Sequence, residues 1–346
     1  MTQADLGTAI VLKDIHSFHV GGSPVELTGQ PLQEMRVSGS GAPRMVDLNG
    51  TYVAGQLYAQ HYQLVAPRTP QPVLFWHGGA MTGVTWETTP DGRPGWQQVF
   101  LRAGHDVVIS DSVERGRSSW APYPSIYAAP PIFRTKEDAW TLFRMGPASG
   151  FAPDARDRRA FPGQRFPVAA FDQLCAQFVP RWTNNDEPIL AAYERLLEHL
   201  GPATVVAHSQ GAWFALNMAI RRPDLIRAIV AIEPAGAPDP TADAARRAAN
   251  VPIVAIWGDY CDALPAWTKY KSQVTGFLHQ VEAAGGQVDV FDLPQMGIHG
   301  NSHMPMMDDN SAEIAALVLT WIADIEAEQE DSTQSSGDKS AAGATG

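Results

Sequence analysis

The residues with the clearest chemical potential in this sequence surround Ser209. Residues 205–212 read VVAHSQGA, so an apolar run leads into a serine and a helical pattern follows. Ala207 and Gly211 stand two positions either side of the serine, and small residues at these places let the backbone turn sharply. Such a turn exposes a hydroxyl at a helix start, where free amide groups favour a developing negative charge. We therefore predict that Ser209 is a nucleophile.

A serine nucleophile also needs hydrogen-bond donors for the oxygen that becomes negative when a carbonyl is attacked. The amide that follows the serine supplies one donor, here Gln210, and a loop after an earlier strand supplies the other. Residues 75–80 (FWHGGA) have this character, because glycine lets the backbone approach a substrate closely. We assign Gly79 as the second donor and keep Gly78 as the alternative.

The general base is expected late in the chain, since the acid and then the histidine follow the serine in enzymes with such an elbow. Two histidines stand in residues 297–305 (GIHGNSHMP). His303 lies nearer the last helical pattern, and we favour it as the base. His299 is the alternative, and it could instead line the pocket or hold the loop by a hydrogen bond.

A carboxylate must hold the imidazole in its working tautomer and stabilise the imidazolium. Asp259 follows the apolar run 253–257, and Glu233 follows the preceding run, 228–232. Glutamate is longer by one methylene, so it can reach across from that neighbouring strand. Position alone favours Asp259, and the residues themselves leave the choice open.

The elements that would position these residues alternate along the chain. Apolar runs that predict buried strands cover residues 73–76, 107–110, 204–207, 228–232, 253–257 and 288–293, and helical patterns cover 95–103, 188–200, 212–220 and 311–325. This alternation predicts an α/β fold with a mostly parallel central sheet flanked by helices. Residues 16–20 and 51–63 are more strand-like, and we expect them to form antiparallel strands at one edge.

One long segment interrupts the alternation. Residues 118–187 are rich in proline and aromatic residues, and a long connection in a compact domain is usually functional or disordered. The aromatic content argues against disorder, so we expect a cap insertion over the open end of the sheet. Residues 1–325 are expected to form a single domain, and residues 326–346 a disordered C-terminal tail.

Composition limits the function classes. The 346 residues are 45% hydrophobic and carry a formal net charge of -12, which allows a large core and disfavours binding to nucleic acids or anionic membranes. Cys175 and Cys261 are too few for a disulfide framework, and two free thiols are favoured over one bridge. Without an apparent signal peptide or membrane span, we expect a cytoplasmic protein.

Several segments together resemble a group of bacterial esterases of the α/β-hydrolase fold. The most specific is residues 82–93 (TGVTWETTPDGR), and the others are residues 116–118 (GRS), 208–210 (HSQ), 233–234 (EP) and 300–304 (GNSHM). They occur in order over roughly residues 16–325, which is nearly all of the folded body.

In that esterase group the triad is Ser–His–Glu, with the glutamate after the sixth strand. The resemblance therefore implies Ser209, His303 and Glu233, and it reverses the positional preference for Asp259. It implies a serine carboxylesterase that acts through an acyl-enzyme, and it leaves the natural ester open. The aromatic residues of the insertion suggest a small to medium, partly apolar ester, and this reaction needs no metal or organic cofactor.

Two other functions stay open at this point. One is lactone or amide hydrolysis, or a lyase reaction, on the same triad, because a fold does not determine its chemistry. The other is a non-catalytic ligand receptor. The expected partner is a small-molecule ester, rather than a nucleic acid or a membrane, and the sequence does not decide between a monomer and a homodimer.

Overall fold

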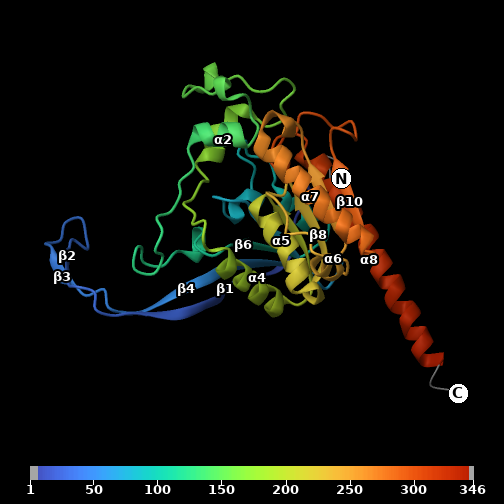
Figure 1. Ribbon diagram of the computed structural model, residues 1–346, viewed down its shortest axis with the longest axis horizontal. Helices are drawn as coiled ribbons and strands as arrows, with labels where there is room; N and C mark the ends of the chain where they lie inside the picture. Colours follow the sequence, from blue (N-terminus) through green and yellow to red (C-terminus); the bar gives the residue numbers. More distant parts are fainter. Residues whose placement is uncertain (1–6, 343–346) are drawn as a thin grey trace.

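An eight-stranded sheet forms the centre of the computed structural model, which describes residues 7–342 and the side chains of residues 7–330 (Figure 1). The strand order is β1-β4-β6-β5-β7-β8-β9-β10. The strands are β1 (Leu12–Leu27), β4 (Gly50–Leu64), β5 (Val73–Trp76), β6 (Val107–Asp111), β7 (Ala203–His208), β8 (Ile226–Ile232), β9 (Ile253–Trp257) and β10 (Val288–Asp292). The predicted α/β class with a mostly parallel sheet is confirmed.

The two edge strands differ from the rest in direction. β4 runs antiparallel to β1 and to β6, with His16 opposite His61, whereas the strands from β6 to β10 pair in parallel. The β1–β4 ribbon extends beyond the sheet and carries the short antiparallel pair β2 (Gln33–Met35) and β3 (Arg44–Val46) near its tip (Figure 1). The predicted antiparallel edge is therefore present, and it is longer than expected.

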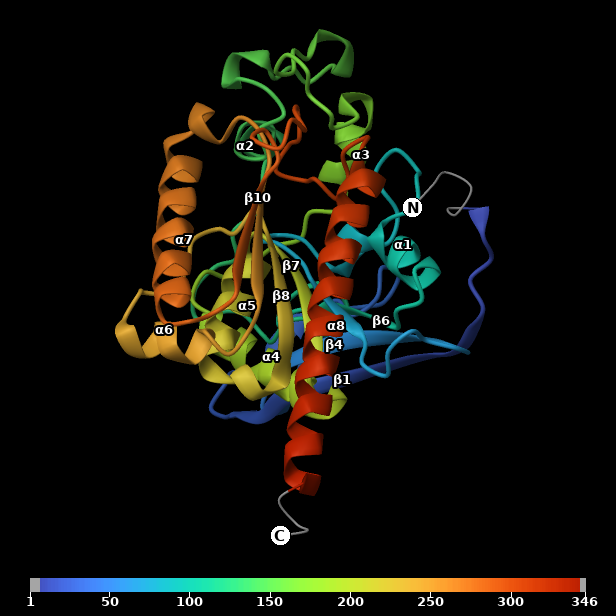
Figure 2. The same cartoon turned by 90° about the vertical axis from the view of Figure 1, so that its right-hand side faces the viewer.

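Helices cover both faces of the sheet. They are α1 (Trp96–Arg102), α2 (Lys136–Leu142), α3 (Phe171–Cys175), α4 (Asp186–Leu200), α5 (Gln210–Arg221), α6 (Ala242–Ala248), α7 (Pro265–Ala283) and α8 (Ser311–Ala342). Residues of α4 to α7 pack with Val205 on one face, and residues of α1 and α8 pack with Val206 on the other (Figure 2). Successive strand residues point to opposite faces, so each parallel strand supplies both cores and must be apolar throughout.

Helix α8 continues past the point where the sequence predicts the end of the fold. Ile325 is buried, and the next turn is held by hydrogen bonds from Gln287 to Glu328 and from Gln329 to the carbonyl of Arg227. Contacts with the sheet thus extend a helix whose alanine and glutamate content favours helical structure. The expectation of disorder therefore does not hold for residues 326–342, which belong to α8, and it stays a prediction for residues 343–346, which lie outside the described residues.

The insertion 118–187 lies over the end of the sheet at which β7 leads into α5 (Figure 2). Its aromatic residues pack together, with ring centroids of Trp140 and Phe171 5.3 Å apart and those of Tyr127 and Trp182 4.9 Å apart. The backbone amide of His303 donates to the carbonyl of Phe143 at 3.0 Å. The insertion is therefore ordered and attached to the late histidine loop.

Three further observations concern the cysteines, membrane-spanning helices and metal ligands. Cys175 and Cys261 are free thiols, in agreement with the favoured expectation. Within residues 7–342, none of the helices combines the length and hydropathy needed to cross a membrane. No group of three or more His, Cys, Asp or Glu residues in that range is arranged to hold a metal ion.

Candidate active site

Ser209 lies at the junction of β7 and α5, with backbone angles of φ 55° and ψ −117°. A positive φ is strained for a residue with a side chain, and neighbouring contacts hold it. The Ser209 amide donates to the carbonyl of Ile232 at 2.9 Å, and the Ala235 amide donates to the Ser209 carbonyl at 3.1 Å. A Cβ atom at Gly211 would lie 2.5 Å from the carbonyl oxygen of His77, so the turn requires glycine there.

Gly78 and Gly79 line the same cavity as Ser209 and Gln210, and the cavity volume is about 210 Å³. A Cβ atom at Gly78 would lie 2.8 Å from Nδ1 of His208 and 3.1 Å from Cβ of Ser209. A Cβ atom at Gly79 would lie 3.1 Å from Oε1 of Gln210. Both predicted amide sources therefore face one space, and the loop and the elbow are in close contact.

His77 holds this loop in place. Its Nδ1 lies 2.9 Å from the carbonyl of Gly78, and its Nε2 accepts from the Ser112 amide at 3.0 Å. Because the amide can only donate, the proton of a neutral ring is on Nδ1, and that nitrogen donates to Gly78. Burial, together with the nearby Arg115, lowers the pKa of His77 to about 4, so the ring is neutral at ordinary pH.

His303 also lines the cavity, and its Nδ1 lies 3.3 Å from Oε2 of Glu233. An ionised carboxylate only accepts hydrogen bonds, so Nδ1 carries the proton and Nε2 keeps a lone pair. The imidazole is buried against Trp267 and His208, at centroid distances of 4.1 and 4.5 Å. Burial lowers the pKa of His303 to about 4, although Glu233 acts in the opposite direction.

The Glu233 carboxylate is itself held by three donors. Nη2 and Nη1 of Arg144 lie 2.6 and 2.8 Å from its two oxygens, and the Gly258 amide donates to Oε1 at 2.5 Å. Burial alone would raise the pKa of Glu233, but the charge of Arg144 and the contact with His303 hold it at about 2. Glu233 is therefore ionised although it is fully buried.

Asp259 and His299 lie outside this arrangement. The Asp259 carboxylate accepts from the Gly300 amide at 2.9 Å, and it lies 3.6 Å from Nδ1 of His299, an exposed side chain. Neither residue lines the cavity that contains Ser209. The structure thus brings Glu233, rather than Asp259, to His303, because β8 is the strand next to β7 and β9 is one strand further away.

The loop that carries His303 is held in place by hydrogen bonds to Asp308 and from Arg93. Asp308 accepts hydrogen bonds from the amide and the hydroxyl of Ser302, at 2.8 and 2.7 Å. Arg93 donates to the carbonyls of Met307 and Asp308, at 2.7 and 2.8 Å. Residues 82–93 are the segment most specific to the resemblance, and their arginine braces the histidine loop from a distant part of the chain.

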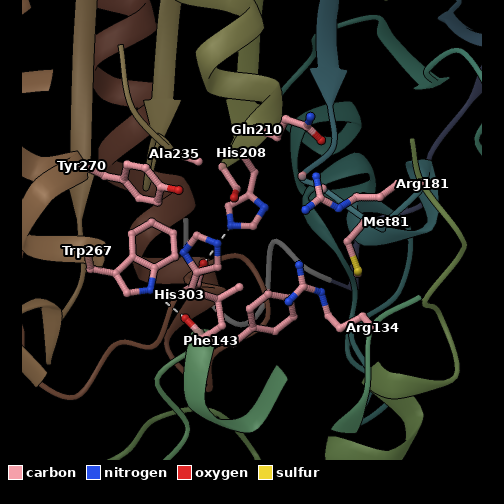
Figure 3. A pocket seen from close by; sticks show the side chains of 14 residues that line it. Met81, Arg134, Phe143, Arg181, His208, Gln210, Ala235, Trp267, Tyr270 and His303 are labelled. Carbon is pink, nitrogen blue, oxygen red and sulfur yellow. Dashed lines mark hydrogen bonds between the residues drawn. The ribbon is translucent and has the colours of Figure 1, made fainter. Parts of the chain in front are cut away.

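Sequence reasoning misses several residues at this site. Arg144 gives no local signal, because its role depends on Glu233, 89 positions away. Trp267 and Tyr270 line the cavity from α7, a helix that the sequence analysis does not predict, although Trp267, Val274 and Val281 are buried at helical spacing. The remaining walls come from the insertion, from Ala235 after β8, and from residues 78–81, which we call the oxyanion loop after the role predicted for it (Figure 3).

Ser209 and His303 share the cavity without a direct hydrogen bond between their side chains in the described part of the chain. Catalytic hydrogen bonds in ligand-free enzymes are often long and tighten when a substrate binds. The arrangement offers a hydroxyl, an imidazole with a free lone pair and two amide sources around one small space. It has the parts required for nucleophilic attack on a carbonyl group.

Comparisons with known proteins agree with this geometry. A family model described as the alpha/beta hydrolase fold matches residues 71–254. The chain is 31% identical over 338 residues to the probable secreted lipase phiG of Fungal sp. (strain ATCC 74256), covering 83% of this chain and 91% of the lipase. It is also similar to the solved structure of a bacterial esterase, with 32% identity and a TM-score of 0.78, covering 92% of this chain and 97% of that one.

Proposed function

The chain belongs to the α/β-hydrolase fold family, and from this premise we propose that it is a serine carboxylesterase with an acyl-enzyme on Ser209. The main support is one spatial relationship. Ser209 lies on a strained turn that lines the same cavity as His303, and Nδ1 of the His303 imidazole faces the carboxylate of Glu233. Similarity to a bacterial esterase and a probable lipase favours ester hydrolysis.

In the proposed acylation step, Nε2 of His303 takes the proton of the Ser209 hydroxyl while its oxygen bonds to the ester carbonyl carbon. The carbonyl oxygen becomes negative and is stabilised by the amides of Gly79 and Gln210. One such donor typically contributes a factor of about a hundred to a thousand in turnover. The imidazolium is stabilised by Glu233, which stays ionised.

Acylation is completed when His303 returns its proton to the leaving alcohol as the carbon–oxygen bond of the ester breaks. The acyl group remains on Ser209. Water then enters, gives a proton to His303 and attacks the acyl carbonyl. The bond between the acyl carbon and the Ser209 oxygen breaks as His303 returns that proton to the oxygen, which releases the acid and restores the free serine. Besides the substrate and water, these proton transfers use only Ser209 and His303.

The shape of the cavity supports a small, partly apolar substrate. Phe143 and Trp267 form apolar walls beside His303. The cavity volume of about 210 Å³ lies below the range of about 300–1,000 Å³ that is typical of sites for small molecules. An ester of short to medium length with an apolar part fits these limits.

Labelling with a fluorophosphonate tests the nucleophile directly. We expect stoichiometric labelling of the wild-type protein and none of Ser209→Ala, with His299→Ala as a matched control that keeps labelling while His303→Ala loses it. Turnover of simple aryl esters above that of matched lactones and amides separates an esterase from the other reactions. A labelled protein with no turnover on any of them would indicate a receptor instead.

Location is a separate question. The sequence analysis predicts a cytoplasmic protein, and one relative is described as a probable secreted lipase. We keep the cytoplasmic location as a proposal. Fractionation of the producing cells, with activity assayed in the medium and in the lysate, tests it.

A further inference from the structure

Two arginines of the insertion line the cavity that contains Ser209. Arg134 and Arg181 both belong to its lining, and no aspartate or glutamate does among the described residues. Figure 3 shows the two guanidinium groups pointing into the cavity from one side, with Trp267 and Tyr270 on the other. The cavity therefore has a cationic wall and an aromatic wall.

Arg134 is held in this position by packing. Its side chain is 9% exposed, and its guanidinium carbon lies 5.1 Å from the ring centroid of Phe143. Its Nη1 pairs with Asp138, whose side chain is 56% exposed. Its Nε is buried and has no hydrogen-bond partner within the described residues. A buried donor without a partner has a substantial desolvation cost, so it is available to a bound acceptor.

Arg181 is even less compensated. Its side chain is half-buried and makes no ion pair or hydrogen bond within residues 7–330, and the one carboxylate on which its charge acts is Asp186, whose pKa that charge lowers against the effect of burial. The positive charge of Arg181 repels that of Arg134. Burial lowers the pKa of Arg134, the Asp138 carboxylate raises it, and the charge of Arg181 lowers it further. Two cations that face one small space repel each other, and an anion placed between them removes the repulsion.

We propose that the cavity selects esters that carry a second group, a carboxylate, which Arg134 and Arg181 bind while Ser209 attacks the ester carbonyl. The substrate class is thus the half-esters of dicarboxylic acids and related anionic esters. This inference rests on the proposed esterase function and narrows it. Guanidinium groups suit carboxylates because they present parallel N–H donors, and the aromatic wall accommodates the hydrocarbon part.

The first experiment compares matched substrates on the wild-type enzyme. Monoethyl glutarate carries the carboxylate, and ethyl 4-carbamoylbutanoate has nearly the same size without the charge. We expect kcat/KM to favour the carboxylate by about tenfold to a hundredfold, the range for hydrogen bonds to charged groups. The succinate and adipate pairs locate the best separation between the two groups. Equal or faster turnover of the neutral partner at all three lengths would overturn the proposal.

The second experiment changes the arginines. Arg181→Met is expected to lower the carboxylate-to-carboxamide ratio by about tenfold, and Arg181→Lys to retain part of the preference. The matched control is Arg156→Met, because Arg156 lies in the same insertion, is 88% exposed and pairs with Asp154. The control keeps the wild-type ratio. An unchanged ratio in Arg181→Met overturns the assignment.

Fluorophosphonate labelling distinguishes a failure of the carboxylate selectivity from a failure of the esterase function itself. Labelling of Ser209 together with equal rates on the matched esters overturns the selectivity alone. Absence of labelling and of turnover on either ester overturns the esterase function and this inference with it. Because Arg134 also pairs with Asp138 and packs against Phe143, the Arg181 variants are the primary test, and circular dichroism verifies that they are folded.

Discussion

Arg144 and Glu233 form a fully buried ion pair in which both guanidinium Nη atoms meet the carboxylate, at 2.6 and 2.8 Å. The same carboxylate faces Nδ1 of His303 at 3.3 Å. Two charges inside the protein are tolerated because each satisfies the other. The pair thus keeps Glu233 ionised beside the imidazole. A neutral carboxyl group at this place would not stabilise the positive charge of an imidazolium.

Removal of Arg144 should destabilise the protein. Arg144→Met leaves the Glu233 carboxylate buried without its counter-charge, and breaking such a pair costs about 3–5 kcal/mol in the free energy of unfolding. Denaturant unfolding measures this loss. The double variant Arg144→Met/Glu233→Gln is expected to recover part of it but no activity, because it removes the orphaned charge and the triad acid together. Wild-type stability in the single variant would contradict this interpretation.

The identity of the triad acid can be tested with two matched variants. Glu233→Gln keeps the size of the side chain but removes its charge, and we expect turnover to fall by about 10⁴-fold, as when an acid that sets the imidazole tautomer is lost. Asp259→Asn is expected to cause a much smaller loss, since Asp259 contacts Gly300 and His299 rather than His303. Steady-state kinetics on one aryl ester decides, and abolition of turnover only in Asp259→Asn would assign the acid to Asp259.

The pH profile should report the buried imidazole. In the proposed reaction His303 serves as the base only when it is neutral, that is, above its pKa, and burial lowers that pKa to about 4. We therefore expect kcat/KM to stay nearly constant from neutral pH down to about pH 5 and to halve near pH 4. Arg144 lowers the pKa of His303, so the residual activity of Arg144→Met should have its acid limb at higher pH.

Circular dichroism over the same pH range is the control, because unfolding in acid would also lower kcat/KM at low pH. A wild-type limb near the ordinary histidine value of about 6.5, with the fold intact, would show that the imidazole is better solvated than its surroundings suggest.

The two glycines of the oxyanion loop should differ in their tolerance to alanine. At Gly78 a Cβ atom would lie 2.8 Å from Nδ1 of His208 and 3.1 Å from Cβ of Ser209, so the loop or the elbow must shift. We expect a loss of turnover of about a hundredfold or more, as for a displaced oxyanion donor. At Gly79 the nearest atom is Oε1 of Gln210, at 3.1 Å, and this flexible side chain can move away.

Turnover and the rate of fluorophosphonate labelling, measured on both alanine variants, check this contrast. A larger loss for Gly79→Ala than for Gly78→Ala would show that the position of the Gln210 side chain, rather than the contact between loop and elbow, controls the reaction.

The amino-acid sequence by itself determined the parts of this site that depend on neighbouring residues. The elbow at Ser209 requires a small residue at position 211, and the close backbone approach of the loop requires small residues at positions 78 and 79. Both features can therefore be recognised from a few consecutive residues of the sequence. The parallel sheet is likewise visible, because strands buried on both faces are apolar throughout. The late histidine loop follows from the order of the elements along the chain.

The residue pattern alone left open which carboxylate meets His303, and the family resemblance implied Glu233. The tertiary structure brings Glu233 to His303, since strand order across the sheet, rather than distance along the chain, places it next to the elbow strand and Asp259 one strand further away. The same holds for Arg144, which is 89 positions from its partner, and for Arg181 in the cavity wall. Contacts between elements that are distant in sequence form when surfaces pack, and local residue patterns carry no record of that packing.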